Sequence, residues 1–174
     1  MQWRFAVLSV VAVVISGCVT TQNGADFTSL SQKIGPTKPG QARIVVFRER
    51  SMGLIDPGWD VKLDGQLMGD LKAGTYVYAD RPAGRHQLSS EVAGFPGVTR
   101  QDISVTAGRT HFFLAKLSDR ARTLNMTSAA GGLVGYAVGA AITSGGDGNP
   151  GPLDFLPLEE GAARQAIAEL RLLE

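Results

Sequence analysis

The sequence predicts a mainly β protein: a small antiparallel β-sandwich of about seven strands, with a Gly-rich apolar segment and a C-terminal helix. Three observations support this fold class. Between residues 42 and 117, apolar and polar side chains alternate in short stretches, which is typical of strands with one buried face. Turn-forming residues separate these stretches about every ten residues. Glycine, which suits tight turns, is abundant, with 22 residues in a chain of 174.

The N-terminus has the features of a bacterial secretory signal peptide. Arg4 supplies a positive charge, and the apolar run from Phe5 to Ile15 is interrupted only by Ser9. This run is too short to span about 30 Å of hydrocarbon as a helix. We therefore expect residues 1–17 to be removed from the mature protein.

The end of this segment, Ile15-Ser16-Gly17-Cys18, resembles the lipobox of bacterial lipoproteins, in which an aliphatic and two small residues precede an obligatory cysteine. The resemblance implies cleavage before Cys18 and attachment of lipid to its sulfur. Cys18 is the single cysteine of the chain, which excludes an intrachain disulfide and a Cys-based metal site. We expect no cofactor beyond this covalent lipid, whose two or more acyl chains give a lasting anchor. The alternative is an ordinary signal peptide that ends at a stray buried cysteine.

The residues around the anchor and the overall charge indicate a location and a set of partners. Val19 follows Cys18 in place of the Asp that resembles an inner-membrane retention signal, so we expect the outer membrane, with the protein facing the periplasm. The net charge is +1 and both signs are interspersed, which argues against a nucleic-acid partner. The expected partners are the membrane, through the lipid anchor, an envelope protein or glycan, and a second copy of the chain.

Composition divides the mature chain into three parts. Residues 18–40 are polar and rich in Ser, Thr, Gly and Pro, and are expected to be the lipidated cysteine and a flexible tether. Residues 41–118 are expected to form the β-sandwich, and residues 119–174 a glycine-zipper segment and a C-terminal amphipathic helix. The predicted strands of the sandwich are 42–48, 59–63, 66–71, 75–79, 85–92, 101–105 and 110–117.

Asp64-Gly65 is a strong hairpin signal between the second and third predicted strands. A two-residue turn would place Leu63 opposite Gln66 and mix the apolar and polar faces. We therefore predict a three-residue turn with Gly65 in the left-handed region. Val61 and Leu67 are then buried neighbours across the hairpin.

Short motifs in this region resemble those of a known family. They are Phe47-Arg48 at a strand end, V-K-L-D-G-Q-L-M-G-D-L at 61–71, A-G-T-Y at 73–76 and P-A-G-R-H-Q-L at 82–88. Together with the lipobox and tether, they resemble the bacterial lipoprotein family of the domain of unknown function DUF2846, and the core pattern is also similar to PEGA-type surface modules. The resemblance covers about residues 42–117. It implies a β-sandwich core, and the family carries no established activity.

The segment from Ala129 to Thr143 is apolar and carries Gly131, Gly135 and Gly139 at a spacing of four. On one helix these glycines align into a glycine zipper that lets another backbone approach closely. The segment would be about 22 Å long, too short to span a bilayer, so we expect a protein surface rather than lipid to cover it. A loop at 144–152 and an amphipathic helix over 156–173 are predicted to follow.

Few residues have the potential for catalysis. His86 and His111 are the only histidines, and both lie in predicted strands. No spacing singles out a pair of carboxylates, and no serine lies in a nucleophile elbow. We therefore predict no catalytic residue and no metal site. The carboxylates that gather in turns and on the first hairpin are Asp56, Asp60, Asp64, Asp70 and Asp80.

Two residues are candidates for recognition. Phe95 lies in the Gly/Pro loop at 94–97, where an aromatic side chain is expected to be exposed. His86 is the second candidate. Trp59 shares the parity of Val61 and is expected to face the core.

These features favour a lipid-anchored, extracytoplasmic envelope lipoprotein that acts as a non-catalytic binding or scaffolding module. Two alternatives remain open from the sequence. One is a hydrolase or metal-site protein that uses His86 with the hairpin carboxylates. The other is a membrane-associated protein that oligomerises through the glycine zipper.

Overall fold

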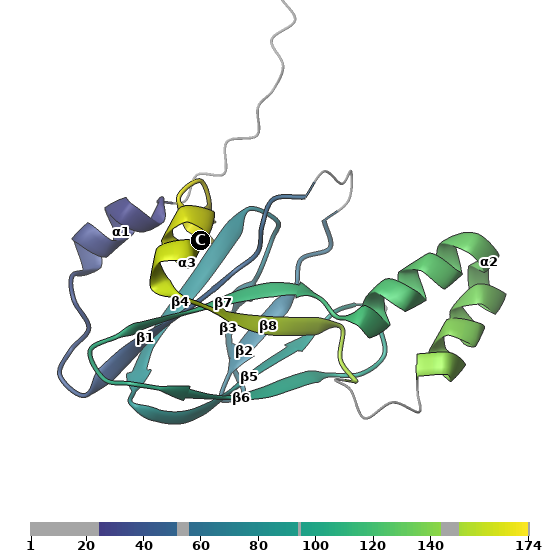
Figure 1. Cartoon of the computed structure of the whole chain (residues 1–174), viewed down its shortest axis with the longest axis horizontal. Helices are drawn as coiled ribbons and strands as arrows, with labels where there is room; N and C mark the ends of the chain where they lie inside the picture. Colours follow the sequence, from purple (N-terminus) through teal and green to yellow (C-terminus); the bar gives the residue numbers. More distant parts are fainter. Residues whose placement is uncertain (1–24, 52–55, 94, 144–149, 174) are drawn as a thin grey trace, which may run out of the picture.

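The computed structural model describes residues 25–51, 56–93, 95–143 and 150–173. In these residues nine strands form two sheets that pack face to face (Figure 1). The strands are β1 (Gln41–Phe47), β2 (Asp60–Leu63), β3 (Gln66–Asp70), β4 (Thr75–Pro82), β5 (Gly84–Glu91), β6 (Thr99–Val105), β7 (Thr110–Leu117), β8 (Leu153–Leu158) and β9 (Arg171–Leu172). The helices are α1 (Phe27–Ile34), α2 (Asp119–Thr143) and α3 (Glu160–Ile167).

The mainly β fold and the sandwich are confirmed, but one sheet is not purely antiparallel. Sheet B has the order β3-β2-β5-β6 and is antiparallel throughout. Sheet A has the order β8-β7-β1-β4-β9, and in it β1 runs parallel to β7 and β4 runs parallel to β9. The parallel pairs arise because long connections separate these strands along the chain, and hairpin turns join only antiparallel neighbours.

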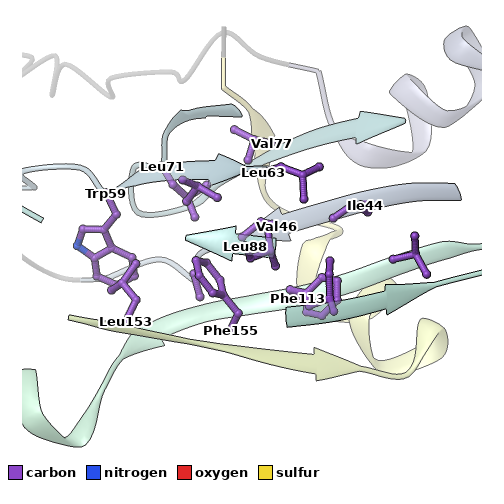
Figure 2. Packing of buried hydrophobic residues seen from close by; sticks show 14 of the residues in the cluster. Ile44, Val46, Trp59, Leu63, Leu71, Val77, Leu88, Phe113, Leu153 and Phe155 are labelled. Carbon is purple, nitrogen blue, oxygen red and sulfur yellow. The ribbon is translucent and has the colours of Figure 1, made fainter. Parts of the chain in front are cut away.

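The core lies between the two sheets. Ile44 and Val46 of β1 face Leu63 and Leu88 of sheet B, and all four side chains are buried (Figure 2). Trp59 closes one end of this core, as its parity predicted. Burial of such side chains supplies most of the favourable free energy of folding.

A second core lies on the outer face of sheet A, beneath α1 and α3. Val45 and Phe47, which alternate with Ile44 and Val46 along β1, are fully buried there. β1 is thus buried on both faces, which explains why its residues 44–47 form a continuous apolar run. The remaining buried members of this core are Phe27, Leu30, Tyr76, Phe112, Ala163, Ile167 and Leu170.

The expectation of a flexible tether through residue 40 is wrong for residues 27–34, which form α1. Asp26 caps this helix by accepting a hydrogen bond of 2.9 Å from the backbone N–H of Ser29. Phe27 and Leu30 lie on one face of the helix and are buried against sheet A. Residues 18–24 of the predicted tether lie outside the described residues.

The sandwich also extends beyond the predicted limit at residue 118. β8 pairs with β7 along the edge of sheet A, and β9 pairs with β4 at the opposite edge. The predicted C-terminal helix over 156–173 is wrong at both ends, because its first residues belong to β8 and its last to β9. Only α3 in the middle is helical, and it packs its buried Ala163 and Ile167 against sheet A.

Side chains from β6 close the exposed edge of β8. The side-chain amide of Gln101 donates to the carbonyl of Phe155 at 2.8 Å and accepts from its N–H at 3.4 Å, in the manner of a neighbouring strand. Two residues further, Pro157 has no N–H to offer a partner. This edge of sheet A is therefore not open to a further strand.

The first hairpin differs from its predicted register. Asp64 and Gly65 both have positive φ, 51° and 79°, and form a two-residue turn that places Leu63 opposite Gln66. A β-bulge then shifts the pairing, so that Val61 lies opposite Gly69, and the exposed fraction of Leu67 is 60%. The positive φ of Gly65 is confirmed, but the buried pair of Val61 and Leu67 is wrong. The bulge shifts the pairing by one residue, so a longer turn is not needed to change the parity.

α2 is two helical arms rather than one continuous helix. Gly132 has φ 57° and ψ −136°, which breaks the helix and turns the second arm back against the first. The resulting hairpin projects from the end of the sandwich opposite α1 (Figure 1). No helix among the described residues is long and apolar enough to cross a membrane.

Candidate functional site

His86 lies near the start of β5, beside the β2–β3 turn and the end of β4, and both of its ring nitrogens have oxygen partners. Nδ1 lies 2.6 Å from a carboxylate oxygen of Asp64, and Nε2 lies 2.8 Å from the carbonyl oxygen of Pro82. Asp64 also accepts a hydrogen bond of 2.9 Å from the backbone N–H of Gln87. Burial alone would lower the pKa of His86, but the hydrogen bonds to Asp64 and Pro82 outweigh it and raise the pKa above 6.5.

This geometry suits an imidazolium that donates two hydrogen bonds. A general base or a metal ligand needs a nitrogen lone pair, and both nitrogens of His86 point at acceptors. The structure therefore brings together His86 and Asp64, two residues of the site that the sequence offered as an alternative. Their hydrogen bonds connect β5 to the β2–β3 turn and to the end of β4. No group of three metal-ligating side chains occurs within the described ranges.

His111 lies apart from His86, near the start of β7. Its Nε2 accepts a hydrogen bond of 2.9 Å from the backbone N–H of Thr106, which requires an unprotonated nitrogen. Burial, with a contribution from the nearby charge of Arg109, lowers the pKa of His111 below 6.5. The two histidines thus favour opposite charge states.

The other predicted carboxylates have structural partners. Asp56 pairs with Arg48 at 2.7 Å and accepts a hydrogen bond of 2.6 Å from the N–H of Ala73. The guanidinium of Arg48 lies 3.6 Å from the centre of the Trp59 ring, at the end of the core.

Asp80 accepts two hydrogen bonds, at 2.8 and 2.9 Å, from Arg43. Of the remaining two, Asp70 pairs with Lys72 at 2.6 Å, and Asp60 is an exposed residue of β2.

A polar groove of about 670 Å³ lies between α1 and the start of α3. Three arginines, Arg43, Arg109 and Arg164, line it. Asp80 pairs with Arg43 and Glu160 pairs with Arg164, at 2.8 Å each. An anion in this groove would have to compete with these carboxylates.

Phe95, the aromatic candidate for recognition, is half-buried and packs against the core between the sheets. Part of its ring therefore contributes to the packing of the core.

The three zipper glycines have different surroundings in the α2 hairpin. A Cβ on Gly135 would lie 1.9 Å from the carbonyl oxygen of Thr127, and one on Gly139 would lie 2.2 Å from the Thr127 hydroxyl oxygen. Gly131, next to the break, has nothing within 4 Å of such a Cβ. The first arm of the same hairpin therefore covers two of the glycines, a cover that the sequence did not suggest.

The outer surface of the hairpin is apolar and exposed. The exposed fractions are 90% for Leu133, 75% for Val134 and 74% for Met126, and Val138 is about half exposed. Four of the six large apolar side chains exposed in the described part of the chain lie on α2. The sequence signal for this surface was present, since no charged residue occurs between Arg122 and Asp147. The glycine spacing predicts a contact at the glycines, whereas these four side chains form the exposed apolar surface of the hairpin.

Comparison with known proteins supports the family resemblance. The family model described as "Protein of unknown function (DUF2846)" matches residues 38–130. The match begins just before β1 and ends in α2, two residues before the break at Gly132. The second arm of α2 and the strands and helix that follow it lie outside the matched range. No curated protein matched the sequence.

Proposed function

We propose that this chain, which belongs to the DUF2846 family of proteins of unknown function, is a lipid-anchored envelope lipoprotein that acts as a non-catalytic binding or scaffolding module. The lipobox that ends in Cys18 supports the anchor, and Val19 supports the outer membrane as its location. The folded part then faces the periplasm.

The observation that carries the proposal is the exposed apolar tip of the α2 hairpin. Exposed apolar surface of this kind marks contact sites, because a partner that covers it removes apolar side chains from water, which is energetically favourable. Elsewhere in the described residues most large apolar side chains are covered: they fill the space between the sheets, α1 and α3 cover sheet A, and Gln101 caps the β8 edge. The hairpin is therefore the part that engages another envelope component.

The reactivity of an introduced thiol in intact cells tests this proposal. Leu133→Cys places a thiol at the tip, and Ser104→Cys places a matched thiol on the exposed face of β6. Each is labelled with a small maleimide in cells, and the yield is compared with labelling after denaturation of the same sample. Cys18 does not react if it carries lipid.

We expect Ser104→Cys to react fully in cells and Leu133→Cys to be protected. Equal reactivity at the two positions would contradict the proposal, because the tip would then be bare in the envelope. The wild-type chain serves as the control for Cys18.

A further inference from the structure

The polarity of the α2 hairpin changes along its axis. Asp119, Arg120 and Arg122 lie at the base, and no charged residue follows up to Thr143. The tip, residues 129–134, consists only of Ala, Gly, Leu and Val. Polarity thus falls from the sandwich toward the turn at Gly132.

Apolar side chains are exposed on both arms of the hairpin and at its turn. Met126 on the first arm, Val138 on the second and Leu133 at the turn are all exposed, and the glycine face is closed against Thr127. An occupant that receives the tip end-on covers the turn and the adjoining parts of both arms together, and lipid is such an occupant.

The serine and threonine hydroxyl groups of the uncharged stretch donate hydrogen bonds within the hairpin. Thr127 donates a hydrogen bond of 2.9 Å to the carbonyl of Thr123, and Ser128 donates one of 3.1 Å to the carbonyl of Asn125. Thr143 in the second arm donates to Gly139 at 2.8 Å. Internal satisfaction of polar groups is what an apolar medium demands of a chain that enters it.

The base of the hairpin is fixed to the sandwich. Arg120 donates to the carbonyls of Pro96 and Pro150, at 2.6 and 2.5 Å. Ser118 Oγ donates to the carbonyl of Gly151 at 2.8 Å and accepts from the N–H of Ala121. The hairpin is thus held as a projection rather than free to fold onto the sheets.

We propose that the α2 hairpin inserts its tip end-on into the surface of the membrane that holds the lipid anchor. The proposal deepens the function proposed above and rests on it, because the anchor brings the tip to the bilayer. Interfacial elements bury their apolar parts about 5–10 Å deep. At 1.5 Å per residue, Arg122 lies about 13 Å below Gly131, which places its charge among the headgroups. The insertion is shallow and does not span the bilayer.

Depth-dependent fluorescence quenching tests the insertion. The full-length lipidated protein is reconstituted into vesicles of phosphatidylethanolamine and phosphatidylglycerol, with an environment-sensitive dye on Leu133→Cys or, as the control, on Ser104→Cys. Quenchers are placed either on lipid acyl chains near the headgroup or in the aqueous phase. Circular dichroism checks that both variants keep the wild-type fold, which is expected because both side chains are exposed.

We expect the dye at position 133 to shift to shorter wavelength and to be quenched by the lipid-borne group, and the dye at 104 to be quenched only from water. Equal behaviour of the two dyes in vesicles that carry the protein would overturn the insertion. If position 133 is protected in cells but not quenched by lipid, a protein or glycan covers the tip, and the proposed function stands.

A failure of the anchor itself is seen separately. Wild-type protein that takes up the dye at Cys18, or that does not float with the vesicles, would contradict lipid anchoring. In that case the same dye at position 133, with vesicles added in excess, still decides whether the tip enters lipid.

Discussion

Closure of the α2 hairpin depends on Gly135, and Gly135→Ala tests it against a matched control. The added Cβ would lie 1.9 Å from the carbonyl oxygen of Thr127 and 2.8 Å from its carbonyl carbon. Both atoms are backbone, so they cannot rotate away as a flexible side chain would. Gly131→Ala adds the same methyl group in the same hairpin, with nothing within 4 Å.

The size of the effect follows from two opposing terms. Ordinary contact begins near 3.4 Å, so the arms must separate by about 1.5 Å at Gly135. Overpacking of this kind costs about 1–3 kcal/mol, and alanine returns up to about 1 kcal/mol of helix propensity. We expect a net loss of about 1–2 kcal/mol in the closure of the hairpin for Gly135→Ala. Gly131→Ala, without the clash, should gain up to about 1 kcal/mol.

Hydrogen exchange of the α2 amides, followed by mass spectrometry, measures the closure directly. Because about 1.4 kcal/mol corresponds to a tenfold change, Gly135→Ala should speed exchange about 5- to 30-fold. Gly131→Ala should slow it by up to about fivefold. The amides of β1 should exchange as in the wild type in both variants. Identical exchange of α2 in the two variants would refute the packing of Gly135 on Thr127.

Three further predictions concern the sandwich. In an NMR titration, His86 should titrate above pH 6.5 and His111 below it. Because the raised pKa of His86 means that folding favours its charged form, wild type should be more stable than His86→Gln below about pH 6.5. This difference in the free energy of unfolding should be lost as the pH rises through the pKa of His86 in the folded protein. Gln101→Leu leaves the N–H and carbonyl of Phe155 without partners and should lower the free energy of unfolding by about 1–3 kcal/mol in a urea titration; an unchanged midpoint would contradict the edge cap. Gly65→Val should cost about 1 kcal/mol or more, because φ at this position is 79°, and a variant as stable as wild type would argue against the two-residue turn.

The strands were predictable from the sequence where local pattern and burial agree. The continuous apolar run at residues 44–47 lies in β1, which is buried on both faces. β8 was missed because Pro152 and Pro157 read as loop and helix-start signals, while its position depends on pairing with β7 about forty residues earlier in the chain. Such pairing leaves no local trace in a single sequence.

The candidate sites were predictable in their residues but not in their geometry. His86 and Asp64 were both named, yet their contact depends on the pairing of β2 with β5, which places Leu63 opposite Leu88. The glycine spacing was recognised as a packing face, and Gly135 and Gly139 do pack closely. The partner of that face is the first arm of the same hairpin, since Gly132 breaks the helix that the spacing alone would have continued.

A lipid on Cys18 is proposed to hold this module at a membrane, and the mass of the mature N-terminal peptide shows whether the lipid is present. The protein is extracted from purified outer membranes, digested and measured by mass spectrometry. We expect the first residue to be Cys18, with a mass increase equal to a diacylglyceryl group and a further acyl chain. A peptide that begins elsewhere, or a mature chain that carries Cys18 as a free thiol, would contradict the account.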